Sequence, residues 1–214
     1  MRIIKADEKG INLAVKYLKA GKSVVYPTDT SSGLAVDATN VNALKKIYRI
    51  KRKKINSIPM HIVVSSMAQA KKYGVFSETA EKLFKKFLPG PLTLIVESRI
   101  SKLEFGKILA GKTGTIGIRM PKNNIALALV KKLGRPITAT SANPSHKHGG
   151  HDSYTANEVI NQFKNRKDKP DLVLDAGRLK KVKPSTMLEV KGRNVKIIRK
   201  GPVGKIAILK LLRM

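Results

Sequence analysis

Residues 24–34 run Val24-Val25-Tyr26-Pro27-Thr28-Asp29-Thr30-Ser31-Ser32-Gly33-Leu34, an apolar segment that ends at a proline and is followed at once by hydroxyl side chains and one carboxylate. This change from apolar to polar residues predicts a buried strand that is followed by a polar loop. Loops at strand ends commonly form the binding sites of open α/β sheets. The segment therefore indicates an α/β fold with a site at this strand end.

Three later stretches repeat the pattern, at 115–121, 137–144 and 182–190. Each places Ser, Thr, Asn or Arg at the edge of an apolar, β-prone run. We predict that the four stretches form the walls of one site. The alternative is four ordinary strand ends, and because polar loop residues are common the pattern alone leaves that alternative open.

Hydrophobic periodicity predicts helices and strands that alternate along the chain, and hence a mixed α/β sheet. Asn42, Ser77 and Thr155 are candidate N-caps, and Gly21 and Gly134 are placed to end helices. The sequence contains no internal repeat and no long linker, so residues 1–214 are expected to form a single domain. Helices are expected at 8–20, 42–50, 66–73, 77–87, 125–133, 155–163 and 206–212, and strands at 23–26, 60–65, 92–96, 115–119, 136–140, 172–174, 187–190 and 195–199.

The chain carries 44 Lys and Arg against 14 Asp and Glu, a formal net charge of +30. Such a charge attracts polyanions, which points to nucleic acid or phosphate-rich substrates. The alternative is a lysine-rich proteome, although thermophile surfaces usually gain Glu together with Lys. With 5% aromatic residues and no Trp, a platform that stacks on bases is not indicated.

Cysteine is absent, which excludes disulfides and Cys-based metal sites. No apolar run approaches the roughly 18–20 residues that span a bilayer. Residues 1–8 lack the apolar core of a signal peptide. We therefore expect a cytoplasmic protein without a membrane partner.

Two motifs are interpreted as coincidental. Gly106–Thr113 fits the P-loop expression, but a P-loop follows a strand and opens a helix, whereas here a strand is expected after the motif. His146, His148 and His151 have a spacing that could bind a metal ion, but they lie in a Gly- and Ser-rich segment that we expect to be a solvated loop.

The remaining polar residues suit phosphate chemistry. The basic run 51–54 offers donors to phosphates, and Arg119 and Arg199 offer planar forks for a carboxylate or a phosphate. The histidines are assigned to two loops, so no Ser-His-acid combination is expected. A cationic pocket without a nucleophile suits attack on phosphorus, driven by positioning and charge stabilisation. Short hydroxyls for a small polar ligand come from Thr28, Thr30, Ser141 and Ser185.

A set of short motifs, taken in order, resembles the YrdC/Sua5 family of threonylcarbamoyl-AMP synthases in its short, YrdC-only form. The resemblance covers about residues 7–203 and implies a twisted open mixed sheet with helices on its faces and a large basic concave cavity. The motifs are Tyr26-Pro27-Thr28-Asp29-Thr30, Ile50-Lys51-Arg52-Lys53, Pro89-Gly90-Pro91-Leu92-Thr93, Ile118-Arg119-Met120-Pro121, Thr140-Ser141-Ala142-Asn143 and Pro184-Ser185-Thr186.

The resemblance implies an enzyme that condenses L-threonine, bicarbonate and ATP to L-threonylcarbamoyl-AMP and diphosphate. Mg²⁺ would accompany the ATP, without a tightly bound cofactor, and a separate transferase complex would pass the group to adenosine 37 of tRNA. Lys51, Lys53 and Arg119 would be the catalytic cations. By resemblance, threonine would be bound by Thr28, Arg119, Ser141 and Ser185, and ATP by Lys51, Lys53, Thr115, Asn143, Thr155 and Arg199.

The chain departs from the family pattern at three places. Ser31-Ser32 stands where an aromatic residue is usual, and Lys53 stands where an arginine is usual. Ile58 replaces a usual asparagine before Pro59, which removes a polar contact to ATP. Because lysine cannot reproduce the bidentate grip of arginine, weaker ATP binding is expected.

Two further functions remain open at this stage. One is a non-catalytic protein that binds tRNA or double-stranded RNA on the same fold, which the charge and the altered loops would permit. The other is a carbamoyl-adenylate domain like that of hydrogenase maturation proteins, which normally lies inside a much longer chain.

Overall fold

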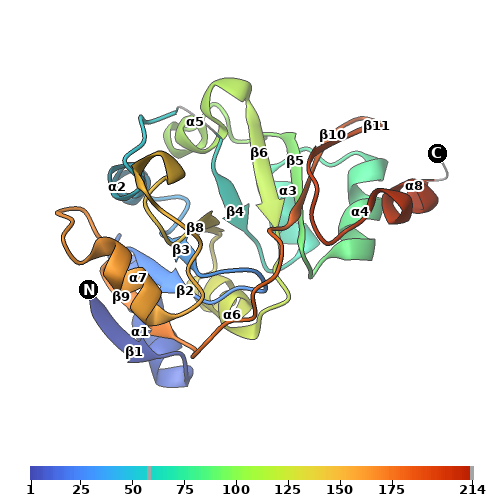
Figure 1. The fold of residues 1–214 in the computed structure, drawn as a ribbon. Coiled ribbons are helices and arrows are strands. Elements are labelled where there is room, and N and C mark those ends of the chain that lie inside the picture. The colour runs from blue at the N-terminus through green and yellow to red at the C-terminus, as the bar shows by residue number, and fades with distance from the viewer. Residues whose placement is uncertain (57–58, 213–214) are drawn as a thin grey trace.

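The computed structural model describes residues 1–56 and 59–212, which form two mixed sheets with helices packed around them (Figure 1). The α/β class is thus confirmed, but the expectation of one sheet is wrong, because strand patterns predict strands and not their partners. The five-stranded sheet has the order β1 (Arg2–Lys5), β9 (Leu172–Asp175), β2 (Val24–Tyr26), β3 (Gly33–Ala35), β8 (Thr140–Ser141). The six-stranded sheet has the order β11 (Asn194–Arg199), β10 (Thr186–Lys191), β5 (Leu92–Glu97), β6 (Thr115–Arg119), β4 (His61–Val63), β7 (Ile137–Thr138).

The segment around Ala139 connects the two sheets. The single strand expected at 136–140 is broken there: β7 pairs with β4 in one sheet, and β8 pairs with β3 in the other. The Ala139 amide donates to the His61 carbonyl oxygen at 2.8 Å, and the Ala142 amide donates to the Ser32 carbonyl oxygen at 2.8 Å. This crossing places the polar loop after β2 next to the six-stranded sheet.

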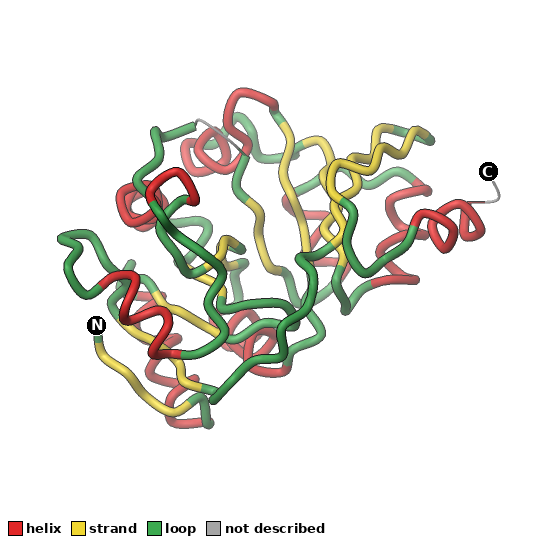
Figure 2. The backbone as a smooth tube through the Cα atoms, in the orientation of Figure 1, coloured by secondary structure: helices red, strands yellow, loops and turns green. Residues whose placement is uncertain are grey.

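Most helices agree with the sequence pattern to within a few residues, and their bounds follow (Figure 2). Among the described residues no helix has both the length and the apolar character that a membrane span requires. The helices are α1 (Glu8–Lys19), α2 (Val41–Lys51), α3 (Met67–Tyr73), α4 (Glu78–Phe87), α5 (Glu104–Ala110), α6 (Asn124–Leu133), α7 (Ala156–Phe163) and α8 (Lys205–Leu212), with 3-10 turns at Gly111–Thr113 and His146–His148.

Two clusters of buried side chains hold these layers together. The smaller cluster packs α1 and α6 against the five-stranded sheet through residues such as Leu18, Val24 and Leu129. The larger cluster lies between α2, α4 and the six-stranded sheet and includes Ile47, Leu83 and Leu94, all fully buried. The helices thus cover the sheets on their outer sides, and the site described below lies between the sheets.

The sequence pattern misses three short elements. Strand β1 is largely exposed and is stabilised by parallel pairing with β9, which lies far away in the chain. Strand β3 has three residues and pairs with β2. Helix α5 occupies part of the P-loop-like segment 106–113, so the order there is helix, turn and strand, which confirms that this segment is not a P-loop.

The N-cap of α2 is Asn40 and not Asn42. The Asn40 side chain accepts a hydrogen bond from the Ala43 amide at 3.0 Å, and Asn42 lies exposed in the first turn. The prediction of Asn42 was wrong because two asparagines two residues apart are equally good caps until the backbone conformation is known. The other predicted caps are confirmed: Ser77 caps α4 and Thr155 caps α7.

Replacing the two asparagines singly tests this cap. Asn40→Ala removes a hydrogen bond to an otherwise unpaired helix amide, so the free energy of unfolding should fall by about 1 kcal/mol. Asn42→Ala is the matched control, and its better helix propensity should leave stability unchanged or raise it by a few tenths of a kcal/mol, about the propensity difference. Urea denaturation measures both. Equal losses in the two variants would contradict the assignment of the cap.

Candidate functional site

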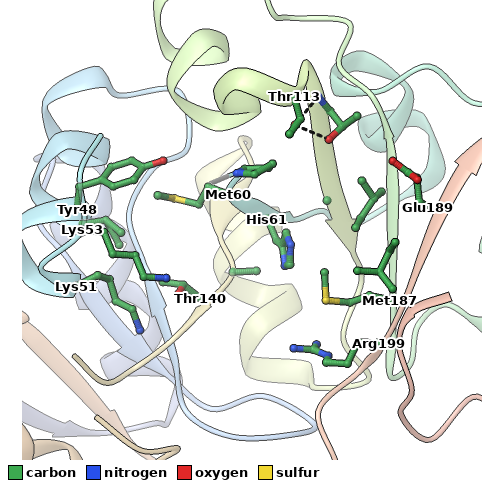
Figure 3. Close-up of a pocket in the computed structure, with 17 residues that line it drawn as sticks. Tyr48, Lys51, Lys53, Met60, His61, Thr113, Thr140, Met187, Glu189 and Arg199 are labelled. Carbon is green, nitrogen blue, oxygen red and sulfur yellow. Dashed lines mark hydrogen bonds between the residues drawn. The ribbon is translucent and has the colours of Figure 1, made fainter. Parts of the chain in front are cut away.

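Two adjoining cavities lie between the sheets, at the strand ends that the sequence pattern singled out. The polar cavity, about 240 Å³, is lined by residues from all four predicted walls, among them Thr28, Arg119, Ser141 and Ser185. The apolar cavity, about 510 Å³, is lined by Ile47, Met60, Ile95 and other residues (Figure 3). The prediction that the four stretches converge on one site is therefore confirmed.

The cavities share four lining residues, so they adjoin one another, and together they are called the chamber below. His61, Ala139, Thr140 and Arg199 border both. A small polar ligand in one cavity and a larger, partly apolar ligand in the other would meet at this junction.

Arg119, at the end of β6, is tied to Asp29 in the loop after β2. The two side chains form an ion pair and are 11% and 12% exposed. The Arg119 Nε atom is buried and has no hydrogen-bond partner among the described residues. Because a buried guanidinium donor without a partner is costly, this atom indicates a place for an anionic or carbonyl ligand. Asp29 was not predicted as a site residue, although it is the one carboxylate in its loop of hydroxyls.

Ser185 and Arg199 form a second hydrogen-bonded group that lines the polar cavity. Arg199 donates from Nη2 to the Ser185 hydroxyl at 3.1 Å and from Nε to the Ser185 carbonyl oxygen at 3.0 Å. The Ser185 hydroxyl also lies 2.9 Å from the Thr93 hydroxyl. Burial, and then the nearby Arg119, lower the pKa of Arg199, while Asp152 acts against them. These two guanidinium groups make this end of the chamber strongly cationic.

Lys51, the last residue of α2, reaches into the chamber from the other wall. Its Nζ donates to the Ser141 carbonyl oxygen and to Asn143 Oδ1, both at 2.7 Å. Burial and the neighbouring Lys53 lower the pKa of Lys51 to about 7, against the opposing effect of Asp152. Burial also lowers the pKa of Lys53. Within the part of the chain that the structure describes, the hydrogen bonds of Lys51 Nζ go to neutral oxygens, and an anionic ligand would provide a charged partner for it and for Lys53.

The remaining predicted site residues have different surroundings. The Thr28 hydroxyl is used inside its own loop, where it donates to the Ser31 carbonyl oxygen at 2.7 Å. Thr115 lines the apolar cavity beside Thr113. Asn143 is 1% exposed, and its Nδ2 atom is buried without a partner among the described residues.

Thr155 lines neither cavity, and neither does Asn143. The Thr155 hydroxyl accepts a hydrogen bond from the Glu158 amide at 3.2 Å as the N-cap of α7. Thr155 lies beside a small hollow next to β9. The structure therefore does not place Thr155 among the residues that surround the two cavities, and its expected role in binding ATP stays a prediction.

His61 was missed, because the sequence interpretation assigned the histidines to two loops. It begins strand β4 and borders both cavities (Figure 3). Burial, followed by the charges of Arg199, Arg119 and Lys53, lowers its pKa to about 4, so the ring is neutral at physiological pH. Gly117 on the neighbouring strand makes room for it, since a Cβ there would lie 2.3 Å from His61 Cδ2. The sequence contained a signal for His61, because this residue falls within the strand expected at 60–65 and not in a loop.

The other three histidines do not form a metal centre. Among residues 1–56 and 59–212, no group of three or more His, Cys, Asp or Glu side chains is arranged to hold a metal ion. The His146 ring is bonded through Nδ1 to the Gly150 carbonyl oxygen at 2.8 Å.

Two of the three places where the chain departs from the family pattern lie at the site. Ser31 and Ser32 line the polar cavity, and Lys53 and Pro59 line the apolar one. Ile58, where a polar contact is expected to be missing, falls outside the described residues.

Comparison with known proteins was made on sequence and on structure. Residues 16–201 match the model of the Sua5/YciO/YrdC family, which is described as telomere recombination. A putative threonylcarbamoyl-AMP synthase of Methanocaldococcus jannaschii is 35% identical over 97% of this chain and 96% of its own length. The threonylcarbamoyl-AMP synthase of Pyrococcus abyssi is 32% identical over 86% of this chain, which spans only 52% of that protein.

Solved structures agree with this assignment. P. abyssi Sua5 complexed with L-threonine superposes with a TM-score of 0.85 at 29% identity, covering 98% of this chain and 59% of that one. Escherichia coli YciO superposes with a TM-score of 0.79 at 27% identity, covering 97% of both chains. The family match over most of the sequence and the 35% identical relative together show that the chain belongs to the Sua5/YciO/YrdC family.

Proposed function

We propose that the protein is an L-threonylcarbamoyladenylate synthase, which condenses L-threonine, bicarbonate and ATP to L-threonylcarbamoyl-AMP and diphosphate. The observation that carries the proposal is the chamber, in which a polar cavity with a buried arginine donor that has no partner among the described residues adjoins an apolar cavity bordered by two lysines. An amino acid fits the first, and a nucleotide fits the second with its phosphates at the junction. The names of the relatives and the threonine complex of P. abyssi Sua5 support this choice.

Threonine is assigned to the polar cavity. The free Nε of Arg119 would donate to its carboxylate, and Asp29 would hold the guanidinium in place. Thr28, Ser141 and Ser185 would bind its remaining polar groups. All four residues line this cavity.

ATP is assigned to the apolar cavity and the junction. Lys51, Lys53 and Arg199 would contact the phosphates, and the base would lie among Ile47, Met60, Ile95 and their neighbours. Asn143 would act through Lys51, whose ammonium group it orients. Thr115 would border the nucleoside.

The chemistry follows from this placement. The threonine amine and bicarbonate form a carbamate with loss of water. The carbamate oxygen then attacks the α-phosphorus of ATP while the bond from that phosphorus to the bridging oxygen of diphosphate breaks. Diphosphate leaves with the electron pair. The surrounding cations stabilise the negative charge that builds up on the phosphoryl oxygens, so the protein acts by positioning and electrostatics.

Mg²⁺ is proposed to arrive with ATP and to be held by its phosphate oxygens. This fits the donor set, because the described residues offer no group of three potential ligands for a resident metal ion. A divalent ion on phosphate oxygens would neutralise the charge that the lysines do not reach.

The product would be consumed by a transferase complex that modifies tRNA, which would place the protein with tRNA in the cytoplasm. A purely RNA-binding role is not favoured, because the chamber contains a small polar cavity with buried donors suited to an amino acid.

The decisive experiment is diphosphate release from Mg-ATP with bicarbonate, measured with and without L-threonine. Release that depends on threonine, and much less on serine or alanine, is the expected result. Folded protein that releases no diphosphate in a threonine-dependent manner would refute the proposal.

Arg119→Lys tests the placement of threonine. Lysine keeps a positive charge next to Asp29 but loses the planar fork, so the KM for threonine should rise about 10- to 100-fold, the usual worth of a charged hydrogen bond. The KM for ATP should change far less. Arg135→Lys is the control, because Arg135 pairs with Asp37 and lines neither cavity. An unchanged KM for threonine in Arg119→Lys would contradict the assignment.

The low pKa of Lys51 predicts proton uptake when Mg-ATP binds. In the free protein the pKa of Lys51 is about 7, and phosphate oxygens would move it back toward 10.5, its ordinary value. Above pH 7 the free amine is largely neutral and must gain a proton on binding, whereas at pH 6 it already carries one. Calorimetry at pH 8 in two buffers of different ionisation enthalpy should therefore show uptake that is reduced at pH 6.

Lys51→Arg is the matched variant, because arginine stays protonated and gains nothing on binding. It should lose most of the uptake at pH 8. Uptake equal to that of the unmodified protein would mean that another group takes up the proton.

A further inference from the structure

The concave face of the six-stranded sheet carries its side chains in rows. One row runs across four neighbouring strands, because His61 is paired with Gly117, Gly117 with Ile95, and Ile95 with Glu189. All four residues line the apolar cavity. The row therefore forms the floor of the apolar cavity, with the His61 ring at one end and the Glu189 carboxylate at the other.

Charge changes along the strands of this floor. The row two residues away, about 6.6 Å at the usual strand rise, contains Arg119 on β6 and Arg199, which is paired with Met187. The next row in the opposite direction pairs Thr115 with Glu97. The floor is thus cationic at the phosphate end, apolar in the middle and acidic beyond.

Glu189 is the carboxylate that reaches the chamber from this floor. Its side chain is 28% exposed, and its ion pair with Lys191 is long, at 3.6 Å, to a lysine that is itself 71% exposed. Such an exposed ion pair contributes little to stability. Figure 3 shows Glu189 at the end of the cavity near Thr113, with Met187 between it and Arg199. The carboxylate is thus well placed to accept a hydrogen bond from a ligand.

We propose that Glu189 determines base specificity, by accepting a hydrogen bond from the exocyclic amine of adenine. The inference rests on the proposed function, which places the phosphates at the cationic row. A nucleotide with its phosphates there lays its base over Gly117 and Ile95, where the glycine leaves a flat surface, and points the far edge of the base toward Glu189. At the 6-position of the ring adenine presents an N–H donor, whereas hypoxanthine and guanine present a carbonyl oxygen there and carry their nearest N–H donor at N1.

The physical basis of discrimination is electrostatic. A carboxylate facing an amine forms a charge-assisted hydrogen bond, but the same carboxylate facing a carbonyl oxygen meets a second acceptor, which repels it. Sites built to bond a donor reject analogues that lack it far more strongly than apolar pockets reject a change of size. Glu189 would therefore select ATP over ITP and GTP without taking part in the chemical step.

The experiment measures kcat/KM for ATP, ITP and 2′-deoxy-ATP in the unmodified protein and in Glu189→Gln. The amide can donate as well as accept, so it tolerates either base edge. The preference for ATP over ITP should fall by about 10-fold or more, which corresponds to the loss of one charged hydrogen bond. The preference for ATP over 2′-deoxy-ATP should not change.

Glu97→Gln is the matched control, because Glu97 lies on the same floor one row further out and borders only the outer groove beyond the apolar cavity. It should keep the unmodified preference between ATP and ITP. If Glu189→Gln keeps that preference while still releasing diphosphate, the inference is wrong. If it loses only the discrimination against 2′-deoxy-ATP, Glu189 reads the ribose and the inference is also wrong.

These outcomes are separate from failure of the proposed function. A protein that releases no threonine-dependent diphosphate with any nucleoside triphosphate refutes the synthase proposal. Binding of ATP and ITP in the absence of threonine, measured by calorimetry, then still tests Glu189: an ATP preference that Glu189→Gln weakens supports the inference, and an unchanged or absent preference overturns it.

Discussion

Two backbone hydrogen bonds around Ala139 hold the chamber together. The amide of Ala139 is bonded to His61 in the six-stranded sheet, and the amide of Ala142 is bonded to Ser32 beside the five-stranded one. Between them the chain leaves one sheet and enters the other within three residues. Since backbone donors must be paired when buried, this crossing determines the spacing of the two sheets, and thus the width of the space in which both cavities lie.

Positive charge dominates this space, and the burial of each cationic side chain is compensated in a different way. Arg119 is neutralised by Asp29, Arg199 is bonded to Ser185, and Lys51 is bonded to neutral oxygens, while burial and the nearby Lys53 lower its pKa. His61 among them stays neutral. Concentrated cations with few counter-charges store unfavourable desolvation in the empty site, which an anionic ligand relieves on binding. Binding energy of this kind is concentrated where a phosphoryl group would gain charge in the transition state.

The acidic residues show that the site is not uniformly positive. Asp29 pairs with Arg119 next to the polar cavity and fixes the direction of that arginine, Asp152 lines the same cavity, and Glu189 lines the apolar one. In a chain with 14 acidic residues against 44 basic ones, these carboxylates are informative about direction. They give the chamber a polarity along which an asymmetric ligand such as a nucleotide can bind in only one orientation.

Sequence alone determined the fold class, the four strand ends that converge and most of the cations and hydroxyls of the site, because periodicity and turn residues are local properties of the chain. The ordered motifs also identified the family. Tertiary structure decided what depends on pairing between distant segments: the division into two sheets, the break at Ala139, the Asp29 and Arg119 pair and the place of His61 against Gly117. The choice of Asn40 over Asn42 was likewise structural. In each case the residue type permitted several partners, and only the backbone path selected one of them.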